Sequence, residues 1–404
     1  MEFAHLDKLT AIALVTTAAL ICGLLLVRLR QPAIVGYILA GVVLGPTGFE
    51  VISNTETVQI LAELGVIMLL FIIGMELSLR GFKSVYKTAL ATAGLQILMA
   101  ISLFWVVGAF MGWSIERVLI FGFATAISST AVAIKILEET DDLNTPVGRV
   151  TVSVLIAQDL AVIPILLIIS AFGTDTAPGL AVFAKIAFAS GFLGLLTWFL
   201  SQREKLALPF TDWIISKPEI IPLAAMAFCF TWAAVSGLLG LSTAYGAFVA
   251  GLIIGNSDVR VYLHKAIEPI QTVLLMVFFL SIGLLIDVNF IIENWHTVLI
   301  VLLVVTVLKT IVNVAILHFL GKPWDRAFHS GVVMAQIGEF SFIIVAAGLA
   351  SHAITGEAYR LMIAVIALSL LISPMWLAIA RHLHEITLGK LDSAAKQTSP
   401  RKPA

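Results

Sequence analysis

Charged residues are scarce in this chain. Only 12% of its 404 residues are Asp, Glu, Lys or Arg, whereas 60% are hydrophobic. A soluble domain carries about one-quarter charged residues. Apolar runs close to the ~20 residues that cross a bilayer recur from one end of the chain to the other. No polar segment long enough for a sizeable soluble domain is left, so the sequence predicts an integral membrane protein in a lipid bilayer.

Cysteine is nearly absent, and charge of neither sign dominates. Cys22 and Cys229 both lie inside apolar runs, which favours inert packing residues over a disulfide or a metal site. The formal net charge of −1 indicates neither a nucleic-acid partner nor an acidic one. The N-terminal stretch MEFAHLDKLT lacks the basic start and the cleavage site of a signal peptide, so the first apolar run is predicted to be a retained span.

Polar, Pro and Gly clusters divide the apolar sequence into thirteen candidate spans, which predict an all-α membrane protein with thirteen transmembrane helices. The second and ninth spans are short, and the stretch 218–255 can be divided differently. The limits are 9–29, 33–50, 57–78, 88–112, 117–137, 147–172, 179–200, 218–238, 241–255, 266–287, 296–320, 326–350 and 357–380.

Lys and Arg are distributed unequally between the two sets of connecting loops. The N-terminus and the loops from even to odd spans hold few basic residues beyond Lys8, Arg117 and Arg360, with Lys185 near a helix start. Because cytoplasmic loops carry the excess of Lys and Arg, the N-terminus is predicted outside and the C-terminus in the cytoplasm. The loops from odd to even spans, together with the C-terminal tail, hold Arg28, Arg30, Arg80, Lys83, Lys87, Lys135, Arg149, Arg203, Lys205, Lys217, Arg260, Lys265, Lys322, Arg326, Arg381, Lys390, Lys396, Arg401 and Lys402.

A weak internal repeat appears at an offset of roughly 210 residues. AGVVLGP at 40–46 matches AGLIIGN at 250–256, and FIIGMELSLRGF from Phe71 matches FLSIGLLIDVNF from Phe279. Two such matches can arise by chance, since small residues suit any helix packing. The matched spans are separated by an odd number of crossings, so the second copy would be inverted, as in many secondary transporters.

The same offset places Ser129 of span five opposite Glu339 of span twelve. Both surrounding segments, ATAISSTAVAI and AQIGEFSFII, interrupt an apolar helix with small or polar residues. Pairs of interrupted helices form the midplane sites of secondary transporters, because unwound backbone is tolerated there when it lines a cavity. The sequence therefore predicts two paired broken helices.

Four spans bring polar groups to one depth. Asp159 lies ten residues beyond Arg149, or about 15 Å deep at the rise of an α-helix, which is the middle of the hydrocarbon core. Lys309 is near the centre of span eleven, and Glu339 and Ser129 lie about twelve residues into spans twelve and five. Their common depth favours a shared site.

Each of these residues also has an ordinary structural reading. Asp159 can be a protonated acid bonded to a carbonyl, although an isolated membrane Asp favours function. Lys309 is too deep to reach the interface, so a carboxylate partner is expected. Glu339 can serve only to cap the amides of a broken helix. The hydroxyls are the weakest members, because Ser and Thr in membrane helices often bond the preceding turn; they are Ser128, Ser129 and Thr130.

Competition between a proton and a cation is the chemistry that this set suits. A carboxylate in a low-dielectric site holds its proton more tightly than in water, and a nearby cation opposes this. Asp159 would then exchange a proton for a bound monovalent cation, whose other ligands would be oxygens of Gln158, the hydroxyls and broken-helix carbonyls. Lys309 would hold Asp159 or Glu339 when the cation is absent. This predicts an antiporter with no cofactor beyond the transported ions.

Six motifs give this chain a family resemblance. In order along nearly the whole chain, they resemble the membrane domain of the monovalent cation:proton antiporter-2 family, and most of all the Kef-type potassium efflux antiporters and related sodium/proton exchangers. The motifs are GYILAGVVLGPTG (36–48), LGVIMLLFIIGMEL (64–77), ISSTAVAI (127–134), AQDLAVIP (157–164), FFLSIGLLID (278–287) and AQIGEFSFII (335–344).

The resemblance implies a sodium/proton antiporter-like fold. Spans one to three and eight to ten would form a dimerisation scaffold, and spans four to six and eleven to thirteen a mobile core that moves as an elevator. Span seven would link them, and the broken spans five and twelve would cross. The family also implies a homodimer in a bacterial-type inner membrane, with a role in potassium transport and pH homeostasis.

The resemblance also implies roles for single residues. Asp159 matches the aspartate that binds the ion and the proton, and Gln158 the position before it, which is a second Asp in electrogenic sodium exchangers. Lys309, Glu339 and Gln336 match charged and polar positions that shape the site. With one carboxylate in place of two, electroneutral one-for-one exchange is predicted. The Kef likeness favours potassium, and sodium/proton exchange is the alternative.

Two departures limit the resemblance. Only HEITLGKLDSAAKQTSPRKPA, a short basic tail within 381–404, follows the membrane domain of 1–380, whereas Kef-type systems carry a nucleotide-binding regulatory domain there. A separate or truncated regulatory domain is therefore an open expectation. The loop between spans nine and ten, NSDVRVYLHKAIEP, contains basic Lys265 where Kef proteins have an acidic regulatory loop.

Three rival functions use parts of the same set. A cation channel would not need a titratable Asp, and a Lys at the midplane would repel cations. An intramembrane aspartyl protease needs two carboxylates that share a proton; Glu339 is a possible second, but a nearby Lys makes a poor match, so no enzyme is predicted. An ion-coupled solute symporter would need a larger cavity, which the sequence leaves open.

Overall fold

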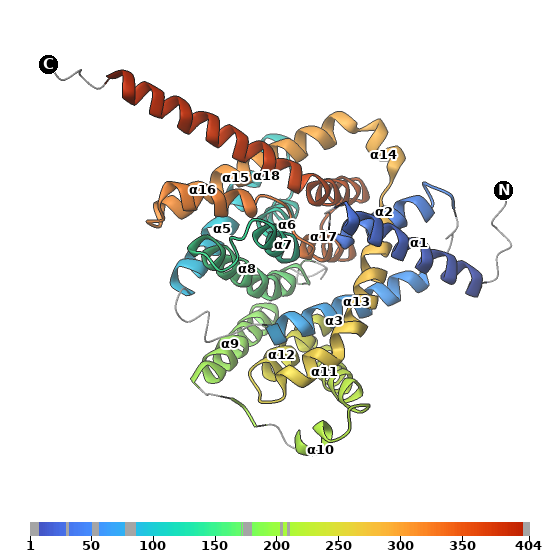
Figure 1. Cartoon of the computed structure of the whole chain (residues 1–404). Coiled ribbons are helices and arrows are strands. Elements are labelled where there is room, and N and C mark those ends of the chain that lie inside the picture. The colour runs from blue at the N-terminus through green and yellow to red at the C-terminus, as the bar shows by residue number, and fades with distance from the viewer. Residues whose placement is uncertain are drawn as a thin grey trace.

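The computed structural model is helical throughout the residues that it describes, which are 8–29, 32–50, 56–76, 86–170, 172, 180–202, 205–207 and 211–398. Among these residues one isolated bridge, between Leu206 and Ser257, is the only β-type pairing. The helices (Figure 1) are α1 (Lys8–Arg28), α2 (Ala33–Leu44), α3 (Glu56–Glu76), α5 (Tyr86–Met111), α6 (Ile115–Ala126), α7 (Thr130–Glu139), α8 (Pro146–Ser170), α9 (Leu180–Gln202), α10 (Thr211–Ile215), α11 (Ile221–Leu238), α12 (Thr243–Gly255), α13 (Arg260–Leu285), α14 (Val288–Glu293), α15 (Trp295–Phe319), α16 (Trp324–Val333), α17 (Phe340–Ala350) and α18 (Gly356–Thr398).

Each predicted span coincides with a helix or a pair of helices. The two spans predicted to be broken are pairs: α6 with α7, and α16 with α17. Within the described part of the chain, six helices are long and apolar enough to cross a membrane by themselves. The count of thirteen crossings stays a prediction.

Three features differ from the predicted spans. The short helices α10 and α14 lie between spans, and α14 begins because Asp287 caps it: its carboxylate accepts a hydrogen bond from the Phe290 N–H. The last helix continues to Thr398 instead of ending near residue 380. Its extension is rich in Ala, Leu and Lys, which are good helix formers.

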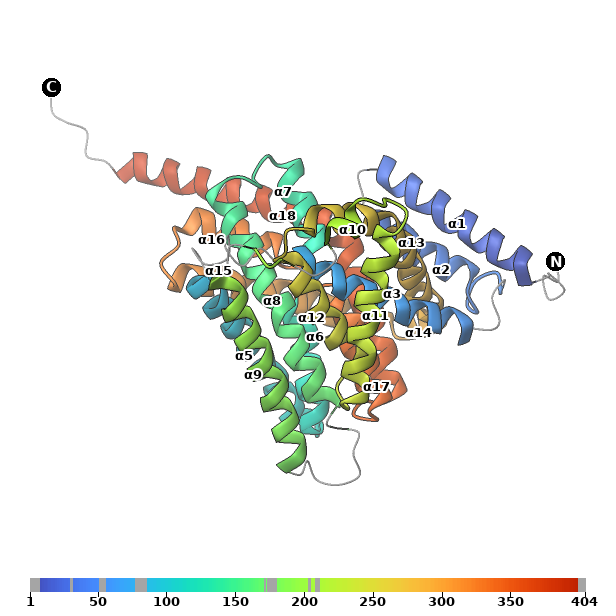
Figure 2. The ribbon, with the colours of Figure 1, turned by 90° about the horizontal axis from the view of Figure 1, so that it is seen from below.

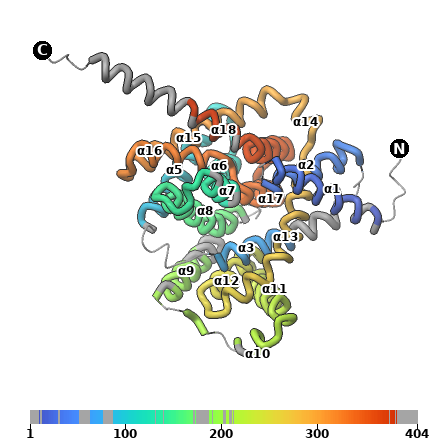
Figure 3. The backbone as a smooth tube through the Cα atoms, viewed as in Figure 1, coloured from blue at the N-terminus to red at the C-terminus, as the bar shows by residue number. Residues whose placement is uncertain are grey.

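The helices pack in two groups (Figure 1). One group contains α1, α2, α3, α11, α12 and α13, and the other contains α5 to α8 and α15 to α18. Helix α9 lies between them and contacts both α8 and α12. Figure 3 shows that the chain passes from the second group through α9 into the first and returns through α13 and α14. Their assignment as scaffold and mobile core stays a prediction.

Glycines bring the backbones of two helix pairs in the first group into close contact. A Cβ added at Gly41 of α2 would lie 2.7 Å from the Cα of Gly283 in α13. A Cβ added at Gly251 of α12 would lie 3.0 Å from the Cα of Gly74 in α3. The repeat offset relates Gly41 to Gly251 and, to within one residue, Gly74 to Gly283, so the two contacts occupy corresponding places in the repeat. We call them the glycine crossings.

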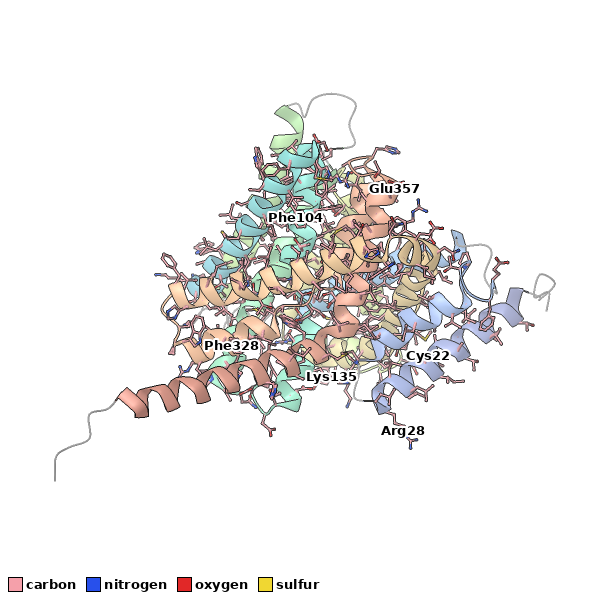
Figure 4. The ribbon with its side chains drawn as sticks, turned by 90° about the horizontal axis from the view of Figure 1, so that it is seen from above. Cys22, Arg28, Phe104, Lys135, Phe328 and Glu357 are labelled. Atoms are coloured by element: carbon pink, nitrogen blue, oxygen red, sulfur yellow. The ribbon has the colours of Figure 1, made fainter. Side chains whose placement is uncertain are left out.

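Two basic residues, Arg28 and Lys135, lie at the same end of the molecule. In Figure 4, Arg28 and Lys135 lie at the opposite end from Glu357, and Figure 2 shows the same helices from the other side. The predicted orientation relative to the cytoplasm is not tested by this arrangement. The end of the FIIGMELSLRGF motif, from Leu77, lies outside the described residues. So do six basic residues used to predict the orientation, which are Arg30, Arg80, Lys83, Arg203, Arg401 and Lys402.

Candidate functional site

Two interruptions of the helical backbone form the centre of the site. Between α6 and α7 the backbone is extended at Ile127, and the Ser129 hydroxyl caps α7 by accepting a hydrogen bond from the Val132 N–H at 3.2 Å. Between α16 and α17 the helix is interrupted from Met334 to Glu339. These short polar sequences open the helix because Ser and Gly favour caps and turns over helix interiors.

The two interruptions lie directly against each other. The Gly338 N–H donates to the Ile127 carbonyl at 2.9 Å, and the Ser128 hydroxyl donates to the Met334 carbonyl at 2.8 Å. A Cβ at Gly338 would lie 2.6 Å from the backbone of Ser128, so only glycine fits this approach. The predicted pairing of the two broken helices is confirmed. We call this contact the polar crossing.

Lys309 corrects one expectation. Its ammonium donates to the carbonyl oxygens of Ile127, at 2.9 Å, and Gln336, at 3.0 Å. These carbonyls belong to the two interruptions, so they lack a helical partner and carry partial negative charge. The prediction of a carboxylate partner is wrong for the contacts that the structure describes. The two helix interruptions supply backbone carbonyls as acceptors at the same depth. Lys309 therefore joins the two halves of the polar crossing.

Asp159 lies on α8 beside the polar crossing and is 4% exposed. One carboxylate oxygen accepts a hydrogen bond from the Thr130 hydroxyl at 2.9 Å. The other oxygen, Oδ1, is buried and has no hydrogen-bond partner in the described part of the chain. A buried carboxylate oxygen without a partner is unfavourable unless a proton or a cation satisfies it.

Glu339 lies in the same buried region, 6% exposed, and acts electrostatically on Asp159. The Ser129 side chain hydrogen-bonds its carboxylate. Its oxygen Oε2 has no partner among the described residues, and its side chain makes no capping bond to α17. Its carboxylate interacts instead with the backbone N–H of Glu339 itself, within the interruption. Like charges in a low-dielectric site favour a state in which one carboxyl is neutralised.

Both ends of the Gln158 side-chain amide bond to protein groups. Its oxygen accepts from the Ser128 N–H at 2.8 Å, and its amide donates to Gln96 at 2.8 Å. Because the Ser128 N–H can only donate, the two ends of this amide are assigned unambiguously. Gln158 thus holds the first interruption in place, and its predicted role as an ion ligand stays a prediction.

Two residues of this network were missed by sequence reasoning. Gln96 on α5 donates to Asn313 on α15 at 2.8 Å, and Asn313 donates to the carbonyl of Met334 at 3.1 Å. A chain of side-chain amides therefore runs from one interruption to the other. Asn313 follows Lys309 by four residues on one helical face, and Gln96 lies in an otherwise apolar stretch; both signals were present in the sequence.

Glu76, the last residue of α3, was also missed. It acts electrostatically on Asp159 although it belongs to the other packing group. Its carboxylate lies 3.2 Å from Nε2 of His264 on α13 and is 57% exposed. An acidic residue that ends an apolar span was its signal in the sequence.

The predicted set is thus brought together. Gln336 completes it by donating from its side chain to the Ser129 carbonyl at 3.2 Å. Seven of the eight predicted residues are buried and Thr130 is half-buried; the buried ones are Ser128, Ser129, Gln158, Asp159, Lys309, Gln336 and Glu339. The arrangement offers one neutralisable carboxylate, a hydroxyl donor and a second carboxylate nearby, enclosed by unwound backbone.

This fold and site define a membrane transporter class, and the comparisons identify its family. The family model described as "Sodium/hydrogen exchanger, transmembrane" matches residues 15–380, so the chain belongs to the sodium/hydrogen exchanger family. It is an integral, multi-pass membrane protein. The resemblance to the monovalent cation:proton antiporter-2 family is confirmed.

Individual relatives differ in their names. The chain is 47% identical over 386 residues to "Iron transporter MagA" of Paramagnetospirillum magneticum, covering 96% of this chain and 88% of that protein. It is 32% identical over 377 residues to "K(+) efflux antiporter 5" of Arabidopsis thaliana, covering 92% of this chain and 66% of that protein. The chain thus spans about two-thirds of the plant relative.

The fold matches a solved antiporter. The sodium proton antiporter MjNhaP1 of Methanocaldococcus jannaschii superposes with a TM-score of 0.71 at 14% identity, over 93% of this chain and 98% of that one. At this identity the likeness concerns the fold alone, and it confirms the sodium/proton antiporter-like fold class.

Proposed function

We propose that this protein exchanges a monovalent cation for protons across the membrane. The observation that carries the proposal is Asp159: a buried carboxylate with one oxygen bound by Thr130 and the other without a partner. A proton or a cation can each satisfy that oxygen, and binding of one excludes the other. Competition of this kind couples the two fluxes, with no cofactor and no bond-making chemistry.

Potassium is our first choice for the cation and sodium the second. Gln158, the residue before Asp159, is neutral, so the Asp159 carboxylate would bind either one proton or one monovalent cation. This supports electroneutral exchange. A K+ efflux antiporter is among the relatives, which favours potassium. Site dimensions, rather than charge, decide between potassium and sodium.

Iron is a second candidate because of the MagA relative. Fe2+ sites in proteins generally use several imidazole, carboxylate or thiolate ligands. Among the described residues no group of three or more His, Cys, Asp or Glu is placed to hold a metal ion. Two carboxylates with a hydroxyl and carbonyls suit a hard, weakly held monovalent cation better, and the experiment below includes an iron arm.

Alternating access by an elevator movement is supported by the division of the site. The polar crossing and Asp159 belong to the second packing group, whereas Glu76 belongs to the first. Sliding one group past the other would carry Asp159 across the membrane without dismantling the hydrogen-bond network. The proposal also includes a homodimer formed through the first group, in an inner membrane and with the N-terminus outside. Regulation would come from a domain outside this chain.

The test is exchange by purified protein in vesicles that contain a pH-sensitive dye. Adding K+ outside is expected to change internal pH, and Asp159→Asn should reduce the response to that of protein-free vesicles. The exposed acidic residue Asp258 supplies a matched control, and Asp258→Asn should exchange at the wild-type rate. Na+, Li+ and Fe2+ arms, each with and without a clamped voltage, identify the cation and the stoichiometry. Wild-type exchange by Asp159→Asn would exclude this mechanism.

A further inference from the structure

A small cavity lies away from Asp159, where α8 begins, α15 ends and α16 begins. Its volume is about 90 Å³. Two of its lining side chains are cationic and none is acidic. The lining residues are Pro146, Val150, Leu317, Lys322, Arg326 and Ser330.

Ser330 gives this cavity the character of a binding site. The residue is 1% exposed and lines the cavity, so its hydroxyl can form a hydrogen bond with a ligand held there.

The charges around Ser330 specify an anion. Lys322 and Arg326 provide two positive charges, and they flank Trp324, the first residue of α16. The nearest acidic residue on α16, Asp325, lies 3.4 Å from Nδ1 of His329 and is 70% exposed. Phosphate oxygens suit an ammonium, a guanidinium and a hydroxyl together.

Exposed aromatic residues show what lies outside the cavity. Phe319 is 84% exposed and Trp324 is 53% exposed, and they flank Lys322 at the junction of α15 and α16. Aromatic rings at helix ends mark the level of lipid headgroups. Phe328 of α16 lies in the same half of the molecule as Arg28 and Lys135, at the end predicted to be cytoplasmic (Figure 4).

We propose that this cavity binds the phosphate group of an anionic phospholipid. Lys322 and Arg326 hold the phosphate oxygens, Ser330 donates to one of them, and the acyl chains lie along Phe319. Basic pockets between membrane helices commonly hold such headgroups. A lipid bound here would tie α8, α15 and α16 together at one end of the packing group that carries Asp159.

The experiment titrates lipid-depleted, full-length protein in neutral detergent with dioleoyl phosphatidylglycerol and follows the melting temperature by tryptophan fluorescence. The melting temperature should rise with lipid concentration, which gives an apparent affinity. Lys322→Gln combined with Arg326→Gln should weaken that affinity roughly 25-fold, because each basic residue contributes about fivefold near an anionic lipid. Ser330→Ala should weaken it less.

Controls separate this site from general attraction. Lys205→Gln combined with Lys265→Gln removes two exposed basic residues elsewhere and should leave the affinity at the wild-type value. Dioleoyl phosphatidylcholine should give no comparable rise. Equal affinities of the two double variants would overturn the proposal. An equal rise with inorganic phosphate alone would overturn the lipid assignment, since the site would then take a soluble phosphate.

Discussion

Two kinds of helix contact in this protein meet opposite needs. In the glycine crossings, Gly41 with Gly283 and Gly251 with Gly74, unbroken helices touch through bare backbone. In the polar crossing, broken helices touch through hydrogen bonds from Lys309, Gln336 and Ser128. Both crossings place backbone against backbone in an apolar environment, but only the polar crossing leaves carbonyls and carboxylates to be satisfied.

The difference lies in what each contact permits. A glycine crossing has no polar group to exchange, so it can only be packed or unpacked, which suits a rigid frame. A polar crossing has donors and acceptors whose partners can change when an ion binds.

Filling a glycine crossing should have the largest effect. In Gly251→Leu the new side chain would enter the backbone of α3, and overpacking of this kind destabilises by about 1–3 kcal/mol or more. We expect little folded protein by size-exclusion chromatography and a lowered melting temperature. Gly191→Leu on α9 is the control, because nothing lies within 4 Å of a Cβ there. Equal behaviour of the two variants would contradict the close approach.

Removing the central cation of the polar crossing comes next. Lys309→Met removes the donor to the Gln336 carbonyl and leaves the Ile127 carbonyl with only the Gly338 N–H, which we expect to destabilise by about 3 kcal/mol. Melting temperature measures this loss. Because Lys309 contacts carbonyls rather than Asp159, the remaining exchange should stay pH-dependent.

A conservative change on the same helix is the control for Lys309. The Thr306 hydroxyl has no partner in the described part of the chain, so Thr306→Val should keep wild-type stability and exchange. If pH dependence collapses in Lys309→Met, then Lys309 competes directly with the cation and the structural role is wrong.

A smaller effect is expected at Thr130, which donates to Asp159. Thr130→Val keeps the shape but removes a hydrogen bond to a carboxylate, which typically contributes about 1.5–3 kcal/mol. The cation concentration for half-maximal exchange should therefore rise about tenfold or more at constant pH. Thr130→Ser retains the hydroxyl and should restore most of the affinity. Failure of Ser to outperform Val would show that the hydroxyl does not act on Asp159.

The smallest effect is expected where α14 meets α18, outside both crossings. The Phe290 N–H and then Arg360 lower the pKa of Asp287, which pairs with Arg360 at 3.1 Å. Because its folded-state pKa is lowered, the Asp287 carboxylate stabilises the folded protein at pH values above its unfolded pKa of about 3.9. This stabilisation is lost as the pH falls through the folded-state pKa. Asp287→Asn should therefore cost under about 1 kcal/mol, unchanged between pH 5 and 8.

Melting temperatures across pH measure this contribution, with Asp287→Ala as the comparison. Ala removes the cap of α14 as well as the charge, so it should destabilise more than Asn, which still caps. A difference between wild type and Asp287→Asn that changes between pH 5 and 8 would contradict the assignment.

Much of the site was predictable because charges in hydrocarbon are few. Asp159, Lys309 and Glu339 stood out in apolar spans, and helix rise placed them at one depth. The interruption at Ser129 and that near Glu339 were predictable from small and polar residues and from the repeat. The structure brings all of them together.

Partners were less predictable than positions. Lys309 was expected to face a carboxylate, yet it donates to two backbone carbonyls, which no side-chain pattern displays. The contacts of Gln158 with Gln96 and with the Ser128 N–H were not predicted either, and its role as an ion ligand stays a prediction. The helical continuation of the chain to Thr398 was also missed, because the hydropathy that defined the spans ends earlier.

By itself, the sequence determined the membrane class, the approximate spans and the depth of each polar residue, since these depend on local composition and on constant helix rise. Which groups satisfy one another depends on how the helices pack in three dimensions. The Gln158–Gln96 and Gln96–Asn313 bonds join residues 62 and 217 positions apart, and such pairings follow from how the helices pack rather than from any local pattern.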